Sequence, residues 1–304
     1  MTKELSVGRG QVEAAVKLID EGNTIPFIAR YRKEMTGSLN DEVLRDLHER
    51  LTYLRNLEEK KAQVLGSIEE QGKLTDELRE RIEAAQTMVV VEDLYRPYRP
   101  KRKTRASVAK EKGLEPLAAF ILAQETTAPI EEEAAKYIRE DEDEAKAVKT
   151  AAEALQGAKD IIAEQISDEA DYRIYIRDIT MKEGKLVTAA KDEKAESVYE
   201  MYYQYEEPIS KVAGHRVLAI NRGENEKFLT VKIEAPEERI LQFLRTKTII
   251  NDNHVTSPIL EEVIADSYDR LIAPAIEREI RNDLTEKAED GAISVFGKNL
   301  EQLL

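Results

Sequence analysis

The chain has 304 residues, of which 46 are Lys or Arg and 61 are Asp or Glu, so its formal charge is −15. An acidic chain repels phosphate, which argues against a general coating of DNA by the whole surface but leaves room for a local basic patch. The absence of cysteine excludes disulfides, thiolate nucleophiles and cysteine zinc sites, and fits the reducing cytoplasm that we expect as its location. No apolar run approaches 18 residues, so we expect no membrane span.

Apolar residues recur at helical spacing through the first third of the chain. Gly22 and Gly72 are typical of helix C-termini, and Pro26 suits the first turn of a helix. The two short helices on either side of Gly22 have the outline of a helix-turn-helix, which other helical hairpins share. The helices predicted for this part span residues 10–21, 26–34, about 40–71 and 76–86.

A basic segment interrupts this helical pattern. Pro97 and Pro100 forbid a continuous helix and favour extended backbone. From Arg96 to Lys112 there are eight basic residues and one acid, a local charge of +7. Subtracting it from −15 leaves −22 on the rest of the chain. We call residues 95–105 the strap.

The remaining sequence predicts further helices and two short strands. Residues 125–144 are acidic and predict solvated helix faces or a connection. The runs HRVLAIN (215–221) and FLTVKI (228–233) favour strands, and RGENEK between them has the composition of a hairpin turn. The helices predicted here span residues 113–123, about 145–167, from 168 onward, 192–206, 237–244 and 258–286.

These elements predict a mainly α protein, a multi-helix bundle with helix-turn-helix-like elements and a small β-hairpin in its C-terminal third. We expect three parts: residues 1–125, a helical domain with the strap; residues 126–206, a second helical segment; and residues 207–304, the hairpin with long helices.

The strap is the sharpest candidate site, because its cations would meet phosphates while two tyrosines stack on unpaired bases. Neutralising five or six phosphates would give log K a slope of about −4 to −5 against log salt, with little sequence preference. The alternative is a strap that pairs with the chain's own acids. The residues concerned are Tyr95, Arg96, Tyr98, Arg99, Lys101, Arg102, Lys103 and Arg105.

A second basic group, Arg30, Arg32 and Lys33, could extend this surface. Because Phe27, Ile28 and Tyr31 are interleaved with it, we favour a helix whose apolar face meets the core. The tyrosines of residues 199–205 could likewise form a stacking platform, although packing in the core is the more favoured interpretation.

Catalytic patterns are scarce. His48, His215 and His254 are the only histidines, and no two have metal-ligand spacing. Three acids, Asp252, Asp266 and Asp269, could be assembled into a metal site on paper, but 61 acids make chance groupings common. Nucleotide-binding and nucleophile motifs are absent from the sequence. We expect a non-enzyme with no metal and no cofactor.

Long segments resemble the start of the bacterial Tex transcription accessory proteins. The run TIPFIARYRKEMTG (24–37) and the run DLYRPYRPKRKTRA (93–106) carry most of the likeness, which continues through YEEPISKVAGHR and SPILEEVIADSYDRLIAPAIEREIR. Members of that family continue into an RNase-H-like domain, helix-hairpin-helix elements and an OB-fold RNA-binding domain. None of these is in this sequence, which therefore resembles the front portion of a longer protein.

The resemblance implies nucleic-acid binding linked to transcription, with RNA or single-stranded DNA as partner. We therefore expect an N-terminal scaffold that binds nucleic acid electrostatically and positions downstream domains. The alternative is a protein-interaction module whose acidic helices dock a basic partner, such as RNA polymerase or ribosome-associated proteins, with little nucleic-acid affinity of its own.

Overall fold

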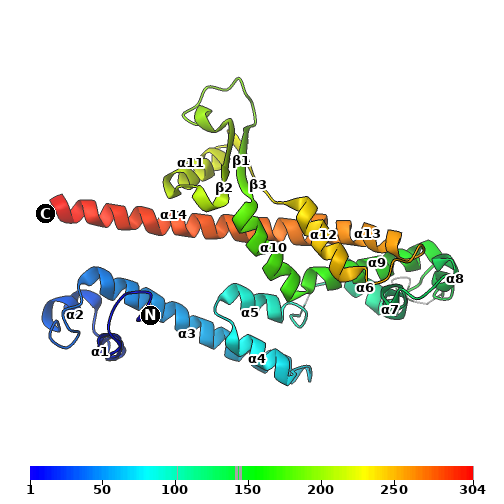
Figure 1. Cartoon of the computed structure of the whole chain (residues 1–304), viewed down its shortest axis with the longest axis horizontal. Coiled ribbons are helices and arrows are strands. Elements are labelled where there is room, and N and C mark those ends of the chain that lie inside the picture. The colour runs from blue at the N-terminus through cyan, green and yellow to red at the C-terminus, as the bar shows by residue number, and fades with distance from the viewer. Residues whose placement is uncertain (101, 141–142, 144–145, 304) are drawn as a thin grey trace. The chain divides into compact units, whose positions relative to one another are not determined.

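A computed structural model describes residues 1–100, 102–140, 143 and 146–303. These residues are predominantly helical, with a three-stranded antiparallel sheet between residues 185 and 234 (Figure 1), which confirms the mainly α fold class. The chain forms two compact units, Met1–Tyr98 (the first unit) and Arg99–Leu304 (the second unit). This division lies inside the strap and does not coincide with the boundaries predicted after residues 125 and 206. Its physical basis is that α7 (Glu115–Ala123) packs on α9 (Ala151–Asp168) of the second unit.

The helices predicted for the first unit are confirmed, and a short one follows them. Two begin at polar caps, where the Asn40 side chain accepts the Val43 N–H at 2.8 Å and the Thr75 hydroxyl accepts the Leu78 N–H at 3.2 Å. Such caps satisfy amides that have no partner inside the helix. The helices are α1 (Arg9–Asp20), α2 (Ile25–Tyr31), α3 (Asp41–Glu70), α4 (Asp76–Ala84) and α5 (Met88–Tyr95).

The core of the first unit lies where α1, α2 and the start of α3 meet. Gly22 ends α1 with a φ of +83°, a conformation that glycine adopts without steric cost. Farther along α3, the buried ammonium of Lys61 donates to the Glu83 carbonyl at 2.8 Å, and Lys60 pairs with Glu92 of α5 at 2.5 Å. The α1–α3 core consists of Ala15, Leu18, Ile28, Leu39, Leu44 and Leu47.

The second unit is built around α9. The helix contacts α6, α7, α8, α13 and the π-helix η3. Its completely buried side chains are Ala154, Ala158, Ile161, Ile162 and Ala163. At Gly157 the absence of a Cβ allows α9 to pack closely against Leu114, because a Cβ there would lie 2.4 Å from Leu114 Cδ1. The other helices are α6 (Arg105–Glu111), α8 (Ile130–Ala135), α10 (Ala170–Glu183), α11 (Gly214–Asn225), α12 (Glu237–Thr248), α13 (Ser257–Asp266), η3 (Ser267–Ile272) and α14 (Ala273–Leu303), with 3₁₀ turns η1 (Glu200–Tyr202) and η2 (Ile209–Lys211).

The long helix predicted after Pro258 is present and contains a π-helical turn. α13, η3 and α14 follow one another without a break in the chain of helical residues, and α14 extends past the predicted end at residue 286. Ser267 at the start of η3 donates to the Ala163 carbonyl of α9 at 2.7 Å. Burial of the neighbouring Tyr268 raises its pKa to about 12.

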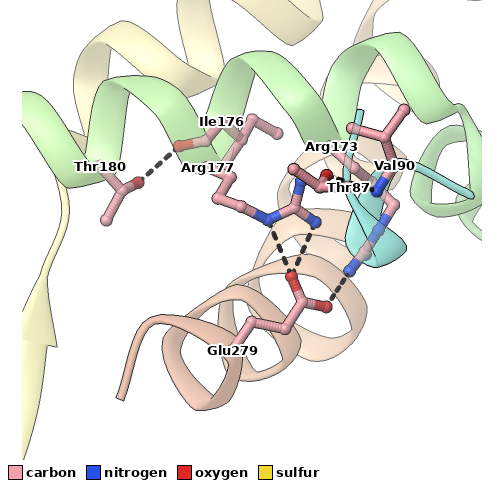
Figure 2. A network of polar contacts seen from close by, with 7 residues as sticks. All are labelled: Thr87, Val90, Arg173, Ile176, Arg177, Thr180 and Glu279. Carbon is pink, nitrogen blue, oxygen red and sulfur yellow. Dashed lines mark hydrogen bonds and ion pairs between the residues drawn. The ribbon is translucent and has the colours of Figure 1, made fainter. Parts of the chain in front are cut away.

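A buried ion cluster joins α10 to α14 (Figure 2). One oxygen of Glu279 accepts from Arg173 at 2.7 Å, and the other accepts from Arg177 at 2.7 and 3.0 Å. Arg173 is completely buried and Arg177 is 16 % exposed, so Glu279 supplies negative charge to one arginine that has left water and one that is largely withdrawn from it.

The small sheet differs from the predicted hairpin. Its strands are β1 (Lys185–Ala190), β2 (Gln204–Pro208) and β3 (Leu229–Glu234) in the order β2-β1-β3, all antiparallel. β3 nearly coincides with the predicted strand 228–233, but residues 215–221 lie in helix α11, so that strand prediction is wrong. The buried positions Val217, Ile220 and Gly223 repeat every three residues, which is a helical period. Gly214 also lets α11 approach α14 closely, since a Cβ there would lie 3.2 Å from the Ala288 Cα.

The helix predicted at 192–206 is also wrong, and strand β1 was not predicted. Buried Leu186 and Thr188 alternate with more exposed neighbours in β1, as expected for a strand. In β2 the half-buried Tyr205 and Glu207 alternate with exposed residues in the same way. β1 pairs with both partners at once, since Leu186 faces Glu207 on one side and Ile233 on the other.

Within the part of the chain that the structure describes, none of the helices is both long and apolar enough to cross a membrane.

Candidate nucleic-acid interface

The strap begins as a turn rather than as the extended segment predicted. α5 ends at Tyr95, and the Tyr98 N–H donates to the Tyr95 carbonyl at 2.9 Å. Arg96 still has helical backbone angles, with φ −51° and ψ −43°. The helix cannot continue, because Pro97 and Pro100 lack the N–H that the next helical bonds need. Proline therefore interrupts the helix here, as predicted, but through a turn.

The two strap tyrosines are half-buried against α3. The Tyr95 hydroxyl shares a hydrogen bond of 3.0 Å with Ser67, and the Tyr98 carbonyl accepts from the Gln71 side chain at 2.9 Å. These contacts fasten the start of the strap to the first unit. They also reduce the ring surface that Tyr95 and Tyr98 present for base stacking.

Most of the strap's cations face solvent. Arg99, Arg102, Lys103 and Arg105 are exposed, whereas Arg96 is half-buried. Lys101, the remaining predicted contact, lies outside the described residues. A strap that served only as internal glue would bury these side chains against acidic helices, so their exposure favours a surface role.

A capped helix follows the strap directly. The Thr104 hydroxyl accepts the Ser107 N–H at 3.0 Å, and the Ser107 hydroxyl accepts the Thr104 N–H at 2.8 Å. This reciprocal pair fixes where α6 begins and therefore where Lys103 and Arg105 leave the backbone.

A cavity of about 390 Å³ opens between α6 and α9 beside these cations. Lys112 on its wall pairs with Glu153 at 2.5 Å, which lowers the pKa of that carboxyl. The polar and charged residues that line the cavity are Lys103, Thr104, Arg105, Lys112, Glu153, Gln156 and Asp160.

Acids of the second unit face one strap cation. Arg270 pairs with Asp266 at 2.5 Å and lies 3.6 Å from Asp160. The hydrogen bond from Arg270, and then the positive charge of Arg105, lower the pKa of Asp266. Burial raises the pKa of Asp160 in spite of the same two arginines. The charge of Arg105 thus acts on these two acids without a direct ion pair among the contacts described, and Arg102 and Lys103 are not part of this network.

The second basic group lies in the first unit, at the end of α2. Arg30, Arg32 and Lys33 are exposed, and Ile28 is the α2 side chain that enters the core. The helix does face the core, as predicted, but through Ile28 and not through the interleaved aromatics, since Phe27 is 36 % exposed and Tyr31 is 61 % exposed.

Neither the histidines nor the three acids considered above form a metal centre. Among the described residues, no group of three or more His, Asp or Glu side chains is arranged to hold a metal ion. Asp266 is instead paired with Arg270.

Comparison with known families decides the identity. The family described as "Tex-like protein N-terminal domain" matches residues 1–69, and the one described as "Tex central region-like" matches residues 125–296, more than half of the chain. The chain belongs to the Tex family.

Curated relatives of this Tex chain are all longer. "Uncharacterized protein YdcI" of Bacillus subtilis is 50% identical over 307 residues, covering 100% of this chain and 42% of the relative. "Transcriptional accessory protein Tex" of Neisseria gonorrhoeae is 40% identical, covering 100% of this chain and 40% of the relative. The human "S1 RNA-binding domain-containing protein 1" is 32% identical, covering 95% and 30%. The chain therefore spans about two fifths of the length of these bacterial relatives and 30% of the human one.

Sequence reasoning missed two features of this Tex chain. The cavity beside the strap depends on α9, whose Gln156 and Asp160 carry no local signal that they face residues 103–112. For the exposed aromatic pair the sequence signals only that the rings can meet, since Phe27 and Tyr31 are four residues apart on a helix, and Ile28 is near enough to the same face that spacing alone does not show which side chains are exposed.

Proposed function

We propose that this Tex-family chain binds RNA or single-stranded DNA electrostatically, without sequence preference, and positions the domains that follow it in the longer relatives. The observation that carries the proposal is the exposure of Arg102, Lys103 and Arg105 beside an open cavity on an otherwise acidic chain. A transcriptional accessory protein and an S1 RNA-binding domain protein among the relatives support a role with nucleic acid. We place this function in the cytoplasm.

The mechanism is phosphate neutralisation. Cations on the strap displace counterions from the nucleic-acid backbone, and the gain in affinity comes from the release of those counterions. Arg102 and Lys103 contribute most, because Arg105 already interacts with Asp160 and Asp266. Contacts to phosphates fix position without reading bases, so the binding tolerates any sequence. The chain itself performs no catalysis.

A protein-interaction role is the second candidate, and the network around Arg105 is the observation that favours it. If the strap mainly interacts with the acids of α9 and α13, the chain's remaining acids would be available to dock a basic protein such as a component of RNA polymerase or the ribosome. Exposure of Arg102 and Lys103 weighs against this role.

A charge-neutralised strap variant separates the two candidates. Fluorescently labelled single-stranded RNA is titrated with the chain at 50 and 200 mM salt, and with a variant carrying Arg99→Ala, Lys101→Ala, Arg102→Ala and Lys103→Ala. A matched control removes four exposed lysines elsewhere in the second unit, Lys182, Lys191, Lys194 and Lys211. The proposal predicts that the strap variant loses most of the affinity at 50 mM salt and the control little. Equal affinities of the strap variant and the unmodified chain would refute the proposal. Cleavage of the RNA in the presence of Mg²⁺ would refute the statement that the chain performs no catalysis.

A further inference from the structure

The end of α2 carries an exposed aromatic pair beside three cations. The ring centroids of Phe27 and Tyr31 are 5.3 Å apart, with the ring planes inclined at 44°. The Arg32 guanidinium carbon lies 5.3 Å from the centre of the Phe27 ring. We call Phe27, Arg30, Tyr31, Arg32 and Lys33 the α2 patch. Its aromatic surface faces solvent, an arrangement unusual for a chain with few aromatic residues, only 6%.

Hydrogen bonds from Thr36 and Gln11 hold the backbone that carries this patch. Thr36, which is completely buried, donates its hydroxyl to the Arg32 and Lys33 carbonyls at 3.4 and 3.3 Å. The Gln11 side chain of α1 donates to the Gly37 carbonyl at 2.9 Å. Gly37 itself has a φ of +60°, which closes the turn after α2. The patch is therefore held in place before any ligand arrives, which lowers the entropic cost of binding.

The charge of the patch selects its ligand. From Gly22 to Lys33 the sequence has three cations and no acid, although the whole chain carries −15. Aromatic residues and Arg are common in protein–protein interfaces, but lysine is depleted there, whereas proteins that bind single-stranded nucleic acid combine cations along the backbone with aromatic rings that stack on the bases. The presence of Lys33 in the patch therefore favours nucleic acid. In a duplex the faces of the bases are covered by their neighbours, so a solvent-exposed ring can stack only on an unpaired base.

We propose that the α2 patch is a stacking site for an unpaired base of single-stranded RNA or DNA. Tyr31 offers the open ring, Phe27 lies beside it with Arg32 over the Phe27 ring, and Arg30 and Lys33 meet the phosphates on either side of the base. This inference rests on the proposed nucleic-acid function and adds to it a site that recognises bases, separate from the phosphate contacts of the strap.

The chain has no tryptophan, so Tyr31→Trp places a single fluorescent reporter at the patch. The probes are a 12-nucleotide oligouridine and a 12-nucleotide strand of the same backbone with abasic sites throughout. We expect the oligouridine to quench the tryptophan emission saturably and the abasic strand to leave it unchanged while still binding. Independently, Phe27→Ala with Tyr31→Ala should weaken oligouridine binding about fivefold or more and leave binding of the abasic strand unaltered.

Phe296→Ala is the matched control, because Phe296 is 70 % exposed and lies in α14 of the second unit. It should change neither affinity. Oligouridine binding without quenching, together with unchanged affinity of the double variant, would overturn the stacking site and leave the strap proposal standing. Failure of the unmodified chain to bind either strand at low salt would overturn both proposals.

Discussion

Replacing Glu279 by alanine should destabilise the second unit by about 3 kcal/mol. This carboxylate accepts three hydrogen bonds from Arg173 and Arg177 at 2.7–3.0 Å (Figure 2). Removing one partner of a buried ion pair costs about 3–5 kcal/mol, because the remaining charge stays out of water. The Glu279 side chain is 30 % exposed, so water can reach part of the site, and we expect the lower end of that range.

Urea unfolding followed by far-UV circular dichroism measures this change, and hydrogen exchange of α10 and α14 shows where the protection is lost. Asp283→Ala is the matched control on the same helix, since it removes an exposed pair with Lys287 and should cost about 1 kcal/mol or less. Glu279→Gln tests the charge at nearly constant volume. If Glu279→Ala and Asp283→Ala unfold at the same urea concentration, the ion cluster of Arg173, Arg177 and Glu279 does not stabilise the fold, which would refute the prediction.

Two further predictions concern the elements that position the strap. Gly157→Ala should destabilise the fold by about 1–3 kcal/mol, because its Cβ would lie 2.4 Å from Leu114 Cδ1. Gly66→Ala in α3 should stabilise it by about 0.5–1 kcal/mol, because nothing lies within 4 Å of the added Cβ. Thermal unfolding in which both variants shift the melting temperature in the same direction would contradict this. The stability lost in Arg270→Ala should depend on pH, because the folded pKa of Asp266 lies below its unfolded value of 3.8. The stabilisation that the Asp266–Arg270 pair gives is therefore complete above about pH 4 and disappears as the pH falls through the folded pKa. A difference between the two proteins that stays constant from pH 7 to pH 2 would refute that assignment.

The helices of the first unit could be predicted because their signals are local. The apolar seam of α3 repeats at helical spacing, and Asn40 and Thr75 are caps that act within three residues. The strap could be located for a similar reason, since its charge and its two prolines, Pro97 and Pro100, are properties of one short segment.

The errors come from contacts that are distant in sequence. Residues 215–221 are a short apolar run that suits a strand or a helix, and packing of Gly214 against Ala288 selects the helix. The half-burial of Tyr95 depends on Ser67, and the electrostatic interaction of Arg105 involves acids of α9 and α13. The exposure of Tyr31 depends on where the core of α1–α3 closes around Ile28.

The salt dependence of single-stranded RNA binding tests the central claim most directly. Each phosphate neutralised on a single strand contributes about −0.7 to the slope of log K against log salt. Replacing Arg99, Lys101, Arg102 and Lys103 by alanine should therefore make the slope of the chain shallower by about 2–3, while the four-lysine control keeps the original slope. Equal slopes for the strap variant and the unmodified chain would show that the strap does not contact phosphate, and would contradict the proposed function.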